Sequence, residues 1–271
     1  MSKMNLFNAI YYSIKPIFHT LVFEIKLQIK KFIIFSVITF ALLFLDSYIN
    51  YFLNQPLPGS QASYYQFGTT YFLIIIVLVV SFFFGGIICS EFKDKTGLEI
   101  LPLTSRFKLV IGKYLANAIL VAGIIGVQYS SMALFAYNFY GGPLLNTLLY
   151  SSLLAILYAL AIGSITTFLS SLLPSKTLVI IIIAGYILIG DLIINSLIIT
   201  STSAGIEPLY SLTYLFEIVT YSLYPDFSTM DRRTIDGIWL FPSLEGALIL
   251  LSLYIVFLFI LGALLFRYRE F

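Results

Sequence analysis

The chain has 271 residues, of which 60% are hydrophobic and 10% are charged, and its formal net charge is +2. Soluble domains carry about 25% charged residues, so this composition excludes a soluble globular protein and requires lipid around much of the surface. So small a net charge does not favour a nucleic-acid partner, and the single cysteine, Cys89, excludes an internal disulfide and a multi-thiolate metal site.

The first predicted element is an amphipathic helix over residues 14–31, with apolar and basic side chains recurring on different faces. Its basic face consists of Lys15, His19, Lys26 and Lys30. A helix of this kind suits the interface between lipid headgroups and water, with Pro16 in its first turn. The alternative is a cytoplasmic extension of the first membrane helix. We therefore divide the chain into an N-terminal part, 1–31, and a single transmembrane domain, 32–271.

Six apolar segments follow, and each is long enough to cross the hydrocarbon core of a bilayer, which takes about 17–25 helical residues. They are 32–53, 69–90, 114–137, 144–173, 177–199 and 244–266. The predicted fold is an all-α polytopic membrane protein with six transmembrane helices, the amphipathic interfacial helix and a large external loop, 200–243, between helices 5 and 6. Within this loop the aromatic stretch 209–223 is too short to span, so we expect a helix or helical hairpin that caps the bundle or dips into the outer leaflet.

The distribution of basic residues predicts the orientation. Of the 15 lysines and arginines, all but Arg232 and Arg233 fall on the flanks that share a side with the N-terminus. Because cytoplasmic flanks carry the excess of lysine and arginine, we expect a multi-pass protein of the cell membrane with both termini in the cytoplasm. The same rule places the segment 91–106 in the cytoplasm.

The segment 91–106 lies between the second and third predicted spans and concentrates charge in a chain that is otherwise poor in it. Glu91, Lys95 and Glu99 follow one another at i, i+4 spacing, which predicts a short helix with a salt-bridged face. The chain contains no G-x-x-x-x-G-K-[ST] motif, so it has no P-loop for ATP. We expect its energy source to be an ion gradient or another subunit.

The pattern of residues from 91 to 116 resembles the permease subunits of ABC-2-type transporters. Their signature after the second membrane helix is similar to E-x-K-x-x-G-T-x-E-x-L-L-x-x-P-x-S-R followed by G-K-x-x-A. The matching positions are Glu91, Lys93, Gly97, Glu99, Leu101, Ser105, Arg106, Gly112, Lys113 and Ala116. The order Thr96-Gly97 is inverted with respect to this signature, and Pro102 comes earlier than the usual proline. The predicted interfacial helix, six spans and external loop also agree with the family's architecture.

The resemblance implies a non-catalytic transport subunit, powered by ATP that a separate ATP-binding cassette subunit binds with Mg and hydrolyses. It implies a coupling helix within 91–106 that sits in a groove of that partner. The coupling residues would be Glu91, Lys95, Gly97, Glu99 and Arg106. A second permease subunit, either the same or a homologous chain, would complete the transporter. The resemblance favours export of a hydrophobic, lipid-linked or peptide-like substrate, with import left open. For Arg106, as for Lys108 and Lys113, the favoured alternative is an interfacial anchor that reaches lipid phosphates.

Four polar side chains fall in the outer halves of the predicted spans. They are Asp46, Gln128, Asp191 and Asn195. An aspartate at the centre of a membrane helix costs about 2.5–3.5 kcal/mol, so such groups usually face the interior of a bundle. The functional hypothesis is that these four line a translocation pathway. The alternative is that both acids reach water or hydroxyl groups near the outer interface.

Three other functions are compatible with the chain. An ion-coupled secondary transporter would use Asp46 and Asp191 as relays, a membrane enzyme would need a polar cluster such as 231–236, and a non-transporting anchor or assembly protein needs neither. The sequence shows no pair of broken half-helices of the kind that secondary carriers use and no polar catalytic cluster. The permease subunit is therefore the leading hypothesis.

Overall fold

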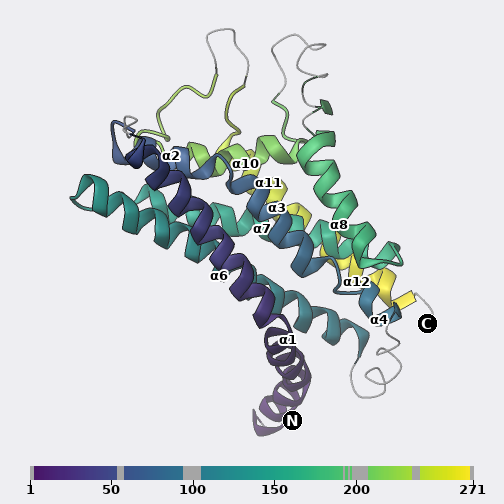
Figure 1. The fold of residues 1–271 in the computed structure, drawn as a ribbon. Helices are drawn as coiled ribbons and strands as arrows, with labels where there is room; N and C mark the ends of the chain where they lie inside the picture. The colour runs from purple at the N-terminus through teal and green to yellow at the C-terminus, as the bar shows by residue number, and fades with distance from the viewer. Residues whose placement is uncertain are drawn as a thin grey trace.

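The computed structural model of the chain describes residues 3–53, 58–93, 105–191, 193–194, 196, 207–233 and 239–268. These residues are helical apart from turns and one isolated bridge between Arg233 and Trp239, and no strand occurs among them. Figure 1 shows the helices as one bundle, with both chain ends and α4 (Cys89–Lys93) at the lower end and α2 (Gln61–Thr69) and α10 (Leu212–Tyr221) at the upper end. We call these the inner and outer ends. The predicted all-α class is confirmed.

Helix α1 (Lys3–Phe52) is continuous, so the predicted amphipathic segment and the first span form one helix with no boundary near residue 31. This continuity is what the alternative, an extension of the first membrane helix, requires. Pro16 lies inside the helix, not in its first turn as expected, and its carbonyl accepts a hydrogen bond from Thr20 Oγ1 at 2.9 Å. Residues 14–49 contain no glycine and no second proline, so nothing else in this stretch interrupts the helix.

Five helices among the described residues are long and apolar enough to cross a membrane. They are α1; Phe72–Glu91, made of α3 (Phe72–Phe84) and the start of α4; α6 (Arg106–Tyr140); α7 (Thr147–Leu172); and Leu244–Tyr268, made of α11 (Leu244–Leu253), the π-helical turn η2 (Tyr254–Leu258) and α12 (Phe259–Tyr268). The predicted span 177–199 is represented by α8 (Lys176–Gly185) and the π-helical turn η1 (Tyr186–Gly190), and part of its remainder lies outside the described residues. The count of six spans stays a prediction.

The core of the bundle is built where α3 and α10 pack on α7. The Phe84 side chain of α3 is fully buried, and a Cβ on Gly163 of α7 would lie 2.9 Å from its ring, so a glycine is needed for this contact. At the outer end, Tyr158 of α7 donates a hydrogen bond from its hydroxyl to the Leu212 carbonyl of α10 at 2.9 Å. A helix is thus present within the segment 209–223, and it packs across the end of the bundle (Figure 1).

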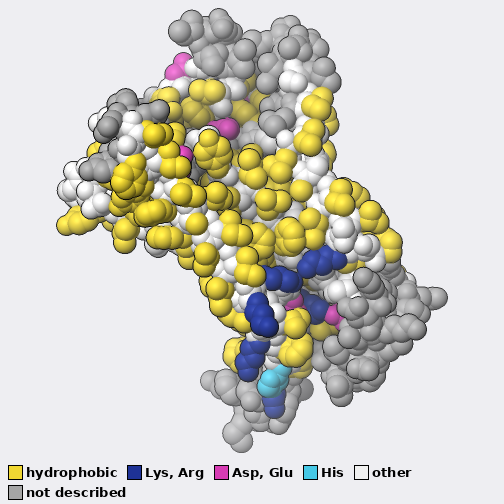
Figure 2. Space-filling model, in the orientation of Figure 1, with side chains coloured by type: hydrophobic (Ala, Val, Ile, Leu, Met, Phe, Trp, Pro, Cys, Tyr) yellow, Lys and Arg dark blue, Asp and Glu magenta, His cyan; other side chains and the backbone are white. Residues whose placement is uncertain are grey.

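The surface between the two ends is largely apolar. Figure 2 shows hydrophobic side chains over most of the described face, with the Lys and Arg side chains gathered at the inner end. On α1, for example, Ile34 is 57% exposed and Val37 is 60% exposed. Soluble monomers rarely expose contiguous apolar surface of this extent. The described fold is therefore that of an all-α membrane protein.

Candidate functional site

A buried ion cluster joins three helices at the inner end. Lys113 of α6 donates a hydrogen bond to Glu91 of α4, and its Nζ lies 3.9 Å from Oε2 of Glu24 in α1. All three side chains are buried. Gln28, one turn beyond Glu24, donates from Nε2 to the Glu24 Oε1 at 2.7 Å. Because a buried charge is costly unless it is paired and hydrogen-bonded, these contacts hold α1, α4 and α6 in one arrangement.

The cluster depends on a close approach of α1 to α6 at Gly112. A Cβ at this position would lie 2.7 Å from Cβ of Thr20 and 2.9 Å from the backbone carbonyl oxygen of Ile17. Only a residue without a side chain fits between the two helices at these distances. Gly112 therefore brings the helix turn that carries Glu24 within reach of Lys113, its neighbour in sequence.

The other flank of the charged segment is fastened to the C-terminal helix. Arg106, the first residue of α6, donates from Nη1 to the carbonyls of Phe266 at 3.2 Å and Arg267 at 3.1 Å. Its guanidinium carbon lies 5.8 Å from the centre of the Phe266 ring. Carbonyls in the last turn of a helix lack partners within that helix, and a cation is favourable there. Arg106 thus caps the C-terminal end of α12.

The structure changes the interpretation of two predicted residues. Glu91 was expected on the partner-facing side of the coupling helix, but it is 4% exposed and turns inward to Lys113. Lys113 was favoured as an interfacial anchor, but it is buried between two carboxylates because Gly112 allows α1 to pack beside it. The coupling residues Lys95, Gly97 and Glu99 lie outside the described residues.

A cavity of about 820 Å³ opens beside the ion cluster. Its lining comes from α1, α4 and the turn before it, α6 and α8, and it includes Lys31 and Lys176 as well as Lys113. Within the described residues, neither Lys31 nor Lys176 has a carboxylate oxygen within 4 Å. Burial, followed by the like charge of Lys31, lowers the pKa of Lys176 to about 8. This cavity therefore holds more positive than negative charge.

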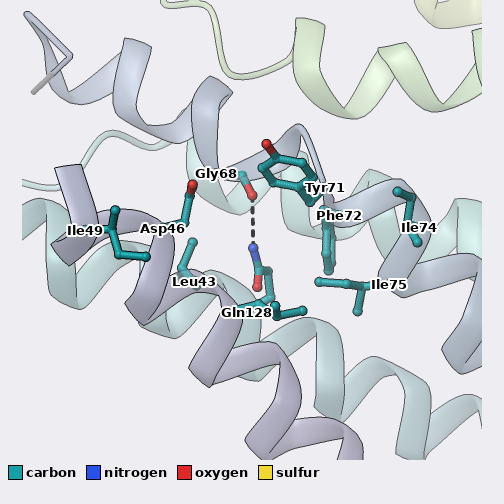
Figure 3. A pocket seen from close by; sticks show the side chains of 10 residues that line it. Leu43, Asp46, Ile49, Gly68, Tyr71, Phe72, Ile74, Ile75 and Gln128 are labelled. Atoms are coloured by element: carbon teal, nitrogen blue, oxygen red, sulfur yellow. Dashed lines mark hydrogen bonds between the residues drawn. The ribbon is translucent and has the colours of Figure 1, made fainter. Parts of the chain in front are cut away.

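A second cavity, of about 400 Å³, lies toward the outer end between α1, α3 and α6. In Figure 3 Gln128 points to the backbone of Gly68, with Asp46 beside them, and all three residues line the cavity. Gln128 Nε2 donates to the Gly68 carbonyl at 3.1 Å, and its buried Oε1 has no hydrogen-bond partner among the described residues. The other lining side chains are mainly apolar. The structure thus brings two of the four predicted pathway residues together.

Asp191 has a different environment, at the start of α10. Its Oδ2 accepts hydrogen bonds from Ser211 Oγ at 2.9 Å and from the backbone nitrogen and Oγ1 of Thr213, both at 2.7 Å. Asp191 is 1% exposed and is not among the residues that line the cavity of Asp46. Local hydroxyl and backbone groups thus bind one carboxylate oxygen of Asp191, whereas its buried Oδ1 has no hydrogen-bond partner among the described residues. Asn195 lies outside the described residues.

Sequence reasoning missed Glu24, which completes the inner cluster. The signal was present, because Glu24 is the only acidic residue before Asp46 and it occurs in a segment rich in lysine. A lone carboxylate among lysines at the start of a membrane helix indicates an internal partner. Its partner was not evident, since Lys113 is far away in sequence.

The chain was compared with known protein families and with curated proteins. No family model matches it, and no curated protein matches it.

Proposed function

We propose that this protein is the permease subunit of an ABC-type transporter, in which a separate ATP-binding cassette subunit hydrolyses ATP to drive export across the cell membrane. The observation that carries the proposal is that the charged segment 91–106 is fastened to the bundle at both flanks. Glu91 fastens one flank through Lys113, and Arg106 fastens the other through the end of α12.

Such fastening is what a coupling element needs. A partner's domain closure moves a membrane helix as a rigid body only if the contacted segment cannot shift independently of that helix. Force applied between the two fastened flanks is passed to α4 and α6, and through the contacts of Lys113 and Arg106 to α1 and α12. Four helices would then respond together.

The proposal divides the predicted coupling residues into two roles. Glu91 and Arg106 are positioning residues, since their contacts are within this chain. Lys95, Gly97 and Glu99 are the residues that we propose contact the ATP-binding subunit. A second permease subunit would pair with this one, and the Asp46 and Gln128 cavity would belong to the pathway of a hydrophobic substrate.

Gentle detergent purification followed by mass spectrometry tests the central claim. We expect a P-loop ATPase to co-purify in stoichiometric amount with the wild-type protein. The variant Glu99→Arg should insert normally but retain much less of this ATPase, because it reverses a charge at the proposed contact.

The matched control is Glu245→Arg, which makes the same charge change at an exposed residue at the start of α11. It should retain the ATPase at the wild-type level. A wild-type protein that purifies alone and takes up substrate with an ion gradient would overturn the proposal in favour of a secondary transporter. Equal ATPase retention by both variants would remove Glu99 from the contact.

The orientation is tested separately with single cysteines. The native Cys89 is buried, so the wild-type protein serves as an unlabelled background. A membrane-impermeant maleimide should label Ser60→Cys in intact cells and Ser105→Cys only after the cells are permeabilised, because both serines are exposed and lie on opposite predicted sides. The reverse pattern would contradict cytoplasmic termini.

A further inference from the structure

We propose that the inner cavity binds the phosphate headgroup of an anionic phospholipid between Lys31 and Lys176. The inference rests on the membrane location of the chain and not on the proposed transporter function. The first observation that supports it is the excess of positive charge in the cavity. Glu24 and Glu91 are both engaged with Lys113, and no other carboxylate among the described residues lies within 4 Å of Lys31 or Lys176.

The two lysines converge on one place from different helices. Lys31 Nζ donates to Gln28 Oε1 at 2.5 Å, and Lys31 of α1 and Lys176 of α8 line the same cavity. Gly86 provides the room, since a Cβ there would lie 3.1 Å from Cδ of Lys176. Bringing two cations together in a partly buried cavity is unfavourable unless an anion is bound between them. A phosphate group supplies both the negative charge and the acceptor oxygens.

The level of the site in the membrane favours a lipid as the source of the phosphate. Lys31, Lys113 and Lys176 each stand directly before a predicted span, at 32–53, 114–137 and 177–199. All three therefore lie at the level of the headgroups, where basic pockets between membrane helices bind anionic lipids. In Figure 2 the basic side chains lie where the apolar band ends, at the inner end.

The walls of the cavity fit the rest of a lipid molecule. Phe23 and Leu27 of α1 line the cavity and are each 64% exposed. They provide an apolar surface beside the lysines on which the glycerol and the first part of an acyl chain can pack. A free phosphate ion would gain nothing from these two side chains.

A test uses the purified full-length protein in detergent, with phosphatidylglycerol, phosphatidylcholine or inorganic phosphate added. We expect phosphatidylglycerol to raise the thermal unfolding midpoint and to remain bound in native mass spectrometry. Phosphatidylcholine, which has no net charge, and inorganic phosphate should raise the midpoint much less and should be retained much less. An equal effect of phosphatidylcholine would contradict recognition of an anion, and an effect of inorganic phosphate as large as that of the lipid would contradict a lipid site.

The informative variant is Lys31→Gln/Lys176→Gln, and its matched control is Lys26→Gln/Lys30→Gln, which removes two exposed lysines of α1 that do not line the cavity. The cavity variant should bind phosphatidylglycerol about thirtyfold more weakly, as expected for two lost lysine contacts. The control should bind nearly as well as the wild type. Lys176→Arg, which keeps the charge, should also retain binding.

Measuring the thermal unfolding midpoint of the Lys31→Gln/Lys176→Gln variant without lipid separates a loss of lipid binding from a folding defect. Because the variant removes cations that have no carboxylate partner among the described residues, it should be at least as stable as the wild type without lipid and lose only the stabilisation by lipid. An equal loss of lipid binding in the control variant would show that general surface charge is responsible and would overturn the proposal.

Discussion

The two ends of the bundle bury carboxylates in opposite ways. At the inner end, Glu24 and Glu91 share Lys113, beside a cavity with two further lysines. At the outer end, Asp191 accepts three hydrogen bonds from groups at the start of α10 and none from a lysine or arginine among the described residues. The inner arrangement joins three helices through charge, whereas the outer one joins the end of η1 to the start of α10 through hydrogen bonds from hydroxyl and backbone groups.

This difference shows that burial alone does not identify a functional acid. The hydrogen bonds to Oδ2 of Asp191 come from neighbouring groups and are explained by the local fold, although its Oδ1 has no partner among the described residues. A group of charges that links several helices and leaves cations unbalanced requires a further explanation, either mechanical coupling or a ligand. The following predictions test whether the two ends differ in this way.

The largest effect is expected for Lys113→Met. Removing this cation leaves two buried carboxylates without a counter-charge, which costs about 3–5 kcal/mol. We expect a strongly lowered midpoint of unfolding in detergent. The variant Glu24→Gln/Glu91→Gln/Lys113→Met, which removes all three charges, should recover most of this loss. Lys26→Met, at an exposed position of α1, serves as the control. Wild-type stability of Lys113→Met would show that the inner cluster does not hold the helices together.

A smaller loss is expected for Gly112→Ala. The added methyl group would meet Thr20 and the backbone of Ile17 and force α1 away from α6, at a cost of about 1–3 kcal/mol. Gly126→Ala in the same helix is the matched control, because a Cβ there has no neighbour within 4 Å. Alanine favours a helix over glycine by about 0.5–1 kcal/mol, so the control should be neutral or stabilising. A change in stability of the same sign for Gly112→Ala and Gly126→Ala would contradict a close approach of α1 to α6 at Gly112.

At the outer end, Asp191→Ala should cost about 0.5–2 kcal/mol, as expected for the loss of a helix cap. The loss is moderated because a buried charge disappears together with its hydrogen bonds. Hydrogen exchange should become faster in α10 and remain unchanged at the inner end. Asp191→Asn keeps an acceptor oxygen and should restore most of the protection. A variant that lowers transport while α10 stays protected would assign Asp191 to the pathway instead.

The sequence predicted the elements of this fold better than their contacts. Apolar length predicted the helices, because about 30 Å of hydrocarbon imposes it. The cytoplasmic position of the segment 91–106 stays a prediction. The direction of Glu91 was not evident from the sequence, because its partner Lys113 lies 22 residues further along the chain. Likewise, the sequence around Asp191 gave no sign that Thr213 would donate hydrogen bonds to one of its oxygens. Spacing along one helix is visible in a sequence, whereas pairing between helices depends on packing.

The smallest change in stability is expected for Gln128→Leu. The variant loses the hydrogen bond to the Gly68 carbonyl, about 0.5–1.5 kcal/mol, but it also removes a buried oxygen that has no partner among the described residues. Stability should therefore remain within about 1 kcal/mol of the wild type. If the cavity with Asp46 belongs to the pathway, substrate-stimulated ATPase activity of the assembled transporter should nevertheless fall.

The control for this variant is Ser130→Ala, on the same helix but lining a different cavity. It should leave both stability and ATPase activity unchanged. A Gln128→Leu protein with wild-type stability and wild-type activity would show that Gln128 makes a local contact only and takes no part in the pathway. This is the role that our interpretation of the outer end gives to Asp191. A selective loss of activity would instead separate Gln128 from Asp191, because Gln128 lines the cavity of about 400 Å³ and Asp191 does not line that cavity.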